Sequence, residues 1–199
     1  RGGKNVTLAS LLHEAISRGC KEVHMRAEDP HAPTHGLRDD ELDAIGRAVG
    51  IGAVKYADLS NDLVRDYVFD LDRMVAFEGD TGPYLQYAYA RIRSIIRKGG
   101  DDGQGAALHI THTEERLLIL CLMKWNDVVH GASDNLEPHR IATYLRSLAA
   151  AFNAFYQACP VLKASSAELR RSRLRLADLT GRVLADGLDL LGISAPSRM

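Results

Sequence analysis

The stretch that decides the fold is residues 78–98, which read EGDTGPYLQYAYARIRSIIRK. Glycine and proline punctuate its beginning, and Asp80 or Thr81 can accept a hydrogen bond from the first turn of a helix. Pro83 suits that first turn, because its missing N–H group has no partner to lose there. The sequence therefore predicts a long helix that begins near Thr81, ends near Lys98 and is followed by a glycine-rich loop.

Outward from this helix, apolar residues recur at helical spacing along most of the chain, and glycine or proline separates the periodic stretches. Gly50 is predicted to end one helix, and residues 27–38 are predicted to form a loop. Residues 63–77 fit either an extended segment or an irregular turn into a short helix. The fold class is all-α, with an antiparallel bundle from residue 81 onward. The other predicted helices cover a stretch before Gly19 and residues 39–49, 52–60, 111–123, 136–159 and 166–191.

The composition is that of a folded domain. Of 199 residues, 46% are hydrophobic and 26% are charged, and the formal net charge is −1. These values exclude wholesale disorder and a globally basic nucleic-acid-binding protein. Cys20, Cys121 and Cys159 are odd in number and widely spaced, which is typical of reduced thiols in a cytosolic protein. The sequence has no apolar run of the roughly 20 residues that a membrane span needs, so no membrane partner is expected.

The motifs of common catalytic and metal sites are missing from the sequence. His31 and His35 lie in the proline-containing loop, His109 and His112 flank a helix start, and no cysteine joins either pair. Two ligands are too few for a zinc site. There is also no serine elbow, Walker loop or His-Glu-x-x-His motif. We therefore expect this chain to hold no metal, no cofactor and no catalytic residue.

One face of the predicted helix at 81–98 carries a distinctive set of side chains. Tyr84, Tyr87 and Arg91 occur at i, i+3 and i+7 and therefore share this face. Aromatic rings beside a guanidinium group can stack on unpaired bases, at about 1–3 kcal/mol per base. The same spacing also fits tyrosines that pack inside a bundle with their hydroxyls at its edge. The spacing alone leaves both interpretations open.

A cluster of basic residues lies at the start of the last predicted helix. If this cluster lies near Tyr84 in the fold, it and the face of the helix at 81–98 form a local positive surface that would attract phosphate groups. A solvated charged face is the alternative. The candidate phosphate contacts are Arg170, Arg171 and Arg173.

Several stretches of the chain resemble arginyl-tRNA synthetases, which are class I aminoacyl-tRNA synthetases. The match covers nearly the whole chain, and we expect the chain, which begins with Arg1, to come from a longer protein. In order, the matching stretches are RGGKNVTLASLLHEA (1–15), GIGAVKYADL (50–59), VFD (68–70), EGDTGPYLQYAYAR (78–91), AFNAFYQACPVL (151–162) and GLDLLGISAPSRM (187–199).

The resemblance implies two parts. Residues 1–77 would be a connector and remnant that follow the catalytic domain, and residues 78–199 would form a helical anticodon-binding domain of the DALR type. The residues that the resemblance places at the anticodon-loop site are Tyr84, Tyr87, Arg91, Asn153, Tyr156 and Met199.

The resemblance also implies a partner, tRNA(Arg), and a parent enzyme that attaches arginine to this tRNA with ATP and Mg²⁺. Arginine and ATP would bind to the catalytic domain, so the chain alone is expected to be inactive. A cytoplasmic monomer is expected. One alternative is a synthetase-like helical module that serves protein interaction or regulation and no longer binds tRNA. Another is a parent synthetase diverted to a different use of arginine transfer.

Overall fold

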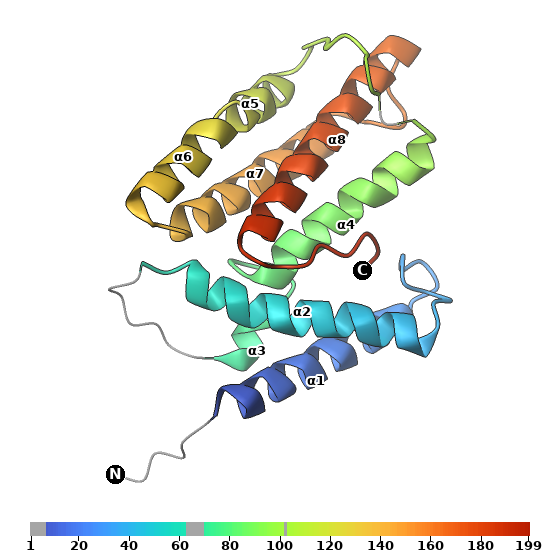
Figure 1. The fold of residues 1–199 in the computed structure, drawn as a ribbon. Helices are drawn as coiled ribbons and strands as arrows, with labels where there is room; N and C mark the ends of the chain where they lie inside the picture. Colours follow the sequence, from blue (N-terminus) through green and yellow to red (C-terminus); the bar gives the residue numbers. More distant parts are fainter. Residues whose placement is uncertain (1–6, 63–69, 102) are drawn as a thin grey trace.

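The computed structural model describes residues 7–62, 70–101 and 103–199, and all regular structure in these ranges is helical (Figure 1). The predicted all-α class is confirmed. The helices are α1 (Leu8–Ala27), α2 (Asp39–Leu59), α3 (Leu71–Met74), α4 (Gly82–Gly99), α5 (Thr113–Leu122), α6 (Trp125–Asn135), α7 (His139–Ala158) and α8 (Ala167–Leu190).

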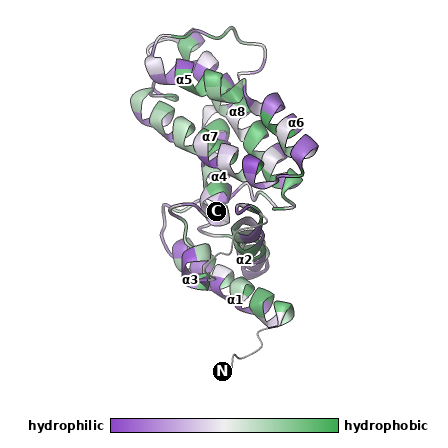
Figure 2. Cartoon of the chain, turned by 90° about the vertical axis from the view of Figure 1, so that its left-hand side faces the viewer, coloured by the Kyte–Doolittle hydropathy of each residue, from purple (hydrophilic) through white to green (hydrophobic). Residues whose placement is uncertain are grey.

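The helices from α4 onward form a bundle, and α1 and α2 lie side by side at one end of it (Figures 1 and 2). Helix α7 packs against α5, α6 and α8, while α4 packs mainly against α8 and α2. Figure 2 shows hydrophilic and hydrophobic residues along the same helices, and a helix with its apolar residues on one side can bury that side. The largest fully buried side chains of the bundle include Leu85, Ile92, Leu145, Phe152, Phe155 and Leu184.

Helix α4 forms where the sequence predicts it, because both of its ends are specified locally. The hydroxyl oxygen of Thr81 accepts a hydrogen bond from the Tyr84 N–H at 3.2 Å. The same hydroxyl donates to the carbonyl of Ala76 at 2.6 Å. Pro83 lies in the first turn, and Gly100 ends the helix with a φ of 66°. Only glycine adopts this left-handed conformation without strain.

Helices α1 and α2 differ from the prediction, since neither ends at its glycine. A Cβ atom on Gly19 would lie 2.4 Å from the carbonyl oxygen of Gly46, and one on Gly50 would lie 2.4 Å from that of Ala15. These glycines therefore lie at a close contact between the two helix backbones. The stretches predicted as 39–49 and 52–60 are one continuous helix. Local propensity predicts a helix end at Gly50, but this glycine lies inside the helix where α2 packs closely against α1.

Three further boundaries are settled by the structure. The chain turns between α1 and α2 over residues 28–38, in agreement with the predicted loop. Of the ambiguous stretch 63–77, α3 is the short helix, whereas residues 63–69 lie outside the described residues, as does most of the VFD motif. Residues 124–135, which lie between two predicted helices, instead contain α6, and the turn begins only after Asn135.

After α8, residues 191–199 run back across α2 and α4 without regular secondary structure, and we call them the C-terminal segment (Figure 1). Its last residue, Met199, is 5% exposed. The segment therefore ties the α1–α2 pair to α4. Three side chains donate hydrogen bonds to its carbonyls: Lys55 to Gly192, Gln86 to Ser194 at 2.7 Å and Arg97 to Ser197 at 3.0 Å.

Candidate nucleic-acid interface

Four of the six predicted anticodon-site residues meet where α4 crosses α7, and we call them the α4–α7 cluster. The amide nitrogen of Asn153 donates to the hydroxyl of Tyr84 at 2.9 Å. The guanidinium of Arg91 donates to the amide oxygen of Asn153 at 3.4 Å. The same guanidinium lies over the ring of Tyr156, with its central carbon 4.6 Å from the ring centroid. The two helices thus present one continuous polar and aromatic surface.

The local pattern of each helix explains why these side chains stay partly exposed. In α4, Leu85 and Ile92 are fully buried, which turns the face that carries Tyr84 and Arg91 toward the edge of the bundle. In α7, Phe152 is fully buried, and its ring stacks on that of Tyr156 at 6.1 Å with an interplanar angle of 26°. The core residues therefore hold the cluster in place from beneath.

Tyr87 lies on the same helix face and is 36% exposed. Its ring meets the ring of Phe77 edge to face, with centroids 6.4 Å apart and an interplanar angle of 76°. The guanidinium carbon of Arg26 lies 4.0 Å from the centroid of the Phe77 ring. The sequence analysis missed Phe77 and Arg26, because they are far apart in the chain and neither belongs to a local pattern.

Met199 does not lie in the α4–α7 cluster. It belongs to a second apolar cluster, which the C-terminal segment closes against α1, α2 and α4. Phe77 is a member of the same apolar cluster, and its ring contacts that of Tyr87. The other buried members are Val23, Leu42, Val49 and Ala90.

The structure corrects the expectation for Arg173, which is not available to a phosphate. Its side chain is 8% exposed, and its Nε donates to the fully buried carboxylate of Glu115 at 2.7 Å. A second guanidinium nitrogen donates to the carbonyl of Pro160 at 2.9 Å. Arg173 therefore joins α8 to α5 inside the bundle.

The carboxylate of Glu115 compensates the charge of the buried Arg173 side chain. Burial raises the pKa of Glu115, but hydrogen bonds from the Thr111 N–H, from Arg173 and from the His112 N–H outweigh it, so the pKa falls below its ordinary value. Glu115 is therefore ionised near neutral pH, and the pair is a charged bridge.

The other two basic candidates lie at the far end of α4 from Tyr84. Arg170 donates to the carbonyl of Gly99 at 2.7 Å, and Arg171 pairs with Asp101 at 3.1 Å. Gly99 follows Tyr84 by 15 residues, which corresponds to about 22 Å along a helix. The basic residues at the start of α8 therefore do not join the surface that carries Tyr84. Phosphate contact by Arg170 and Arg171 stays a prediction.

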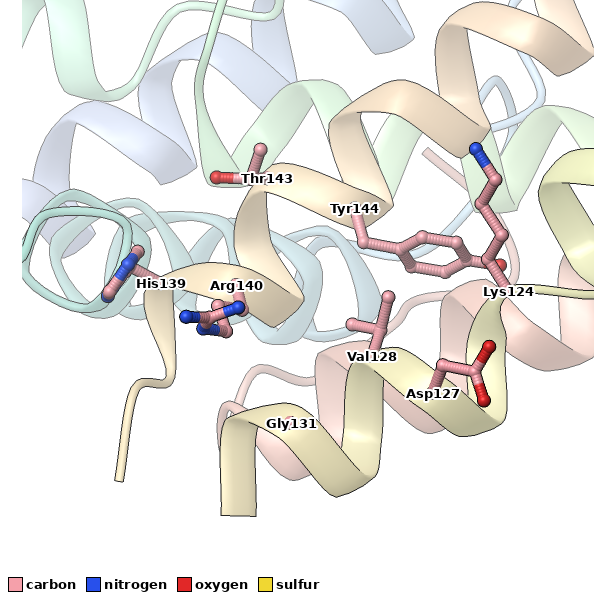
Figure 3. A pocket seen from close by; sticks show the side chains of 8 residues that line it. All are labelled: Lys124, Asp127, Val128, Gly131, His139, Arg140, Thr143 and Tyr144. Atoms are coloured by element: carbon pink, nitrogen blue, oxygen red, sulfur yellow. The ribbon is translucent and has the colours of Figure 1, made fainter. Parts of the chain in front are cut away.

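A separate cavity of about 670 Å³ opens between α6 and α7 (Figure 3). Tyr144 and Val128 provide its apolar wall, while Lys124, Asp127 and Arg140 line it with charges of both signs. None of its lining residues belongs to the α4–α7 cluster. In the described ranges, no group of three or more His, Cys, Asp or Glu side chains is arranged to hold a metal ion.

The family described as the DALR anticodon binding domain matches residues 85–199, which is more than half of the chain. The chain belongs to this family. The match includes every residue of the α4–α7 cluster except Tyr84, which precedes it by one position. The family described as the class I (R) tRNA synthetase catalytic domain matches residues 1–71.

Curated relatives align with the whole length of this chain. The arginine–tRNA ligase of Thermobifida fusca is 50% identical over 201 aligned residues, which cover all of this chain and 34% of the relative. That of Frankia casuarinae is 50% identical over 200 residues and is covered to 33%. This DALR-domain chain thus spans about a third of the length of the curated relatives it matches.

Solved structures share the fold. The arginyl-tRNA synthetase of Thermus thermophilus superposes with a TM-score of 0.86 at 36% identity, over 98% of this chain and 32% of that protein. That of Plasmodium falciparum also gives 0.86, at 30% identity, over 98% and 34%. The resemblance to arginyl-tRNA synthetases is confirmed. Within the described ranges, no helix of this DALR-domain chain combines the length and apolar character that a membrane crossing requires.

Proposed function

We propose that this chain binds the anticodon loop of an arginine tRNA and supplies tRNA recognition to an arginine–tRNA ligase. The observation that carries the proposal is the α4–α7 cluster, in which an arginine and an asparagine link tyrosines of two helices. Membership of the DALR family supports it. Single-stranded loops are read by stacking on aromatic or guanidinium planes and by hydrogen bonds to base edges, and the cluster offers both.

The hydrogen bonds within the cluster determine what it can offer to a base. The amide of Asn153 uses its oxygen for Arg91 and its nitrogen for Tyr84. Because the Tyr84 oxygen accepts this bond, its O–H proton is available to a base acceptor. The ring of Tyr87, a residue that is 36% exposed, provides a stacking surface beside it.

Arg91 contributes a planar cation held in place on the Tyr156 ring. Stacking on the ring restricts the guanidinium, so less conformational entropy is lost when it meets a ligand. One of its nitrogens contacts Asn153, and the other N–H groups can donate to a base edge or to a phosphate oxygen.

The proposal extends to the protein as a whole. Its reaction is the ATP-dependent attachment of arginine to tRNA(Arg), with Mg²⁺, in a cytoplasmic monomer. Arginine and ATP bind to the catalytic domain, and this chain alone does not aminoacylate. Residues 1–77 form the connector and remnant that follow this domain, and residues 78–199 form the DALR-type domain.

The alternative function is a protein-interaction module that no longer binds tRNA. The exposed apolar residues of α5 favour it: Leu117 is 49%, Leu120 is 45% and the neighbouring Met123 is 71% exposed. We prefer tRNA recognition, because a protein-interaction module that does not bind tRNA would not require Tyr84, Asn153 and Arg91 to be linked by hydrogen bonds.

Binding of the chain to an anticodon stem-loop of an arginine tRNA tests the proposal. We expect tighter binding than to a stem-loop with altered anticodon bases, measured by fluorescence anisotropy at low salt. Tyr87→Ala should weaken binding about tenfold, which corresponds to loss of one stacked base. Tyr89→Ala removes a tyrosine from another side of α4 and is the matched control. Equal affinity of the wild type for both stem-loops would contradict the proposal.

A further inference from the structure

The face of α4 that carries Tyr87 and Arg91 continues into a groove of about 320 Å³, which we call the basic groove. Three separate parts of the chain form it: the turn between α1 and α2, the last turns of α4, and the C-terminal segment. Its lining residues are His31, Ala32, Pro33, Ser94, Arg97, Lys98 and Arg198.

The groove concentrates positive charge without acidic compensation. Arg97, Lys98 and Arg198 line it, and none of its lining residues is acidic. In the part of the chain that the structure describes, no carboxylate forms an ion pair with these three side chains. Arg93 and Arg182 differ, because both lie within 4 Å of the carboxylate of Asp178, at 3.5 and 3.9 Å.

The cations of the groove also repel one another. Burial lowers the pKa of Arg97, and the neighbouring charges of Arg198 and Arg93 lower it further. An anion in the groove would relieve this repulsion. Arg97 is fixed by its hydrogen bond to the carbonyl of Ser197 at 3.0 Å, which also holds the backbone next to Arg198.

The groove lies on the same face of α4 as the ring of Tyr87. Ser94 and Lys98 follow Tyr87 by 7 and 11 residues, so they lie on the same helix face. Eleven residues correspond to about 16 Å along the helix. A single strand whose bases contact Tyr87 and Arg91 can therefore bring its backbone to the groove within a few nucleotides.

We propose that the basic groove binds phosphodiester groups of the RNA strand whose bases contact Tyr87 and Arg91. The inference rests on the proposed function, since it takes the anticodon loop as the source of that strand. Phosphate contacts fix the position and register of a strand, whereas base contacts read its sequence. The groove therefore sets affinity and salt dependence, and the α4–α7 cluster sets the choice of bases.

The test is the double variant Lys98→Gln/Arg198→Gln in the 199-residue chain, with binding to the anticodon stem-loop measured between 50 and 200 mM KCl. We expect about tenfold weaker binding at low salt. Each lost phosphate contact should make the salt slope shallower by about 0.7, so the double variant should lose about 1.4. The preference over altered anticodon bases should persist. The control is Arg116→Gln/Lys124→Gln, which removes the same charge at and after α5, a helix that packs on α7 and α8.

The outcomes separate this inference from the proposed function. If the double variant keeps the wild-type salt slope while the anticodon preference persists, the groove assignment is wrong and the proposed function stands. If the slope flattens but the wild type shows no anticodon preference, the groove binds RNA and the proposed function fails. Inorganic phosphate, titrated at constant ionic strength, distinguishes the source. Displacement of RNA by submillimolar phosphate would overturn the assignment to RNA, and we expect no such displacement.

Discussion

The guanidinium carbon of Arg91 lies 4.6 Å from the centroid of the Tyr156 ring and thereby joins α4 to α7 at the surface of the bundle. Their neighbours Ile92 and Phe152 are fully buried in the core of the bundle, whereas Arg91 and Tyr156 stay partly exposed. The contact fixes a planar cation beside two tyrosines, an arrangement suited to unpaired bases.

Arg91→Lys should therefore be far from conservative. Lysine keeps the charge but loses the planar group that stacks on Tyr156 and donates from several positions. We expect stem-loop binding to weaken about tenfold, or about 1.4 kcal/mol. Tyr156→Phe keeps the ring and should stay within twofold of the wild type. Fluorescence anisotropy measures both, and wild-type affinity for Arg91→Lys would show that the stacked geometry is unimportant.

Glu115→Gln should strongly destabilise the fold, because it leaves the Arg173 cation buried without its counter-charge. The expected loss is about 3–5 kcal/mol in the free energy of unfolding, measured by urea denaturation. Glu114→Gln, at the neighbouring and less buried position, is the control and should change stability by less than about 0.5 kcal/mol.

The same pair predicts a pH dependence. The pKa of Glu115 is lowered in the folded state, so its contribution to stability is present above its ordinary value of 4.5 and is lost as the pH falls through the folded pKa. Urea midpoints between pH 6 and pH 3 should therefore decline less steeply in Glu115→Gln than in the wild type. Parallel declines in the two proteins would contradict the assignment.

Two glycine-to-alanine substitutions should change the stability of the fold in opposite directions. Gly50→Ala places a Cβ atom 2.4 Å from the Ala15 carbonyl oxygen, so α1 and α2 must separate, at a cost of about 1–3 kcal/mol or more. Gly131→Ala, in α6, meets nothing within 4 Å and should stabilise by about 0.5–1 kcal/mol, because alanine favours the helix. Thermal unfolding followed by circular dichroism compares them. Equal melting temperatures would refute the close contact.

Tyr56→Phe tests the link between α2 and the start of α4. The buried hydroxyl of Tyr56 donates to the carboxylate of Asp80 at 2.5 Å, and its loss should cost about 1.5–3 kcal/mol. Burial, followed by the bond to Asp80, raises the pKa of Tyr56 well above its ordinary 10.0. Its contribution is therefore complete below pH 10 and is lost as the pH rises further, so the variant should lose less stability between pH 9 and 11. Identical alkaline profiles would argue against this.

Local features of the sequence were sufficient to predict helix α4 and its exposed face. Capping, proline placement and the 3.6-residue period act within a few residues, so Tyr84, Tyr87 and Arg91 were expected on one face. The contribution of Asn153 and Tyr156 came only from the family resemblance, since no local rule brings α7 beside α4. The glycines of α1 and α2 were misread for the same reason, because a glycine at a helix contact resembles a glycine at a helix end.

The sequence by itself determined the all-α class, the position of α4, the amphipathic pattern and membership of a tRNA-reading family, because each depends on neighbouring residues or on recognisable motifs. The tertiary structure alone decided which arginines can meet a ligand. Arg173 turns inward to Glu115, whereas Lys98 and Arg198, 100 residues apart in the chain, line one groove. Charge along a sequence is additive, but its effect on a ligand depends on burial and on the nearest counter-charge, and both are properties of the folded chain.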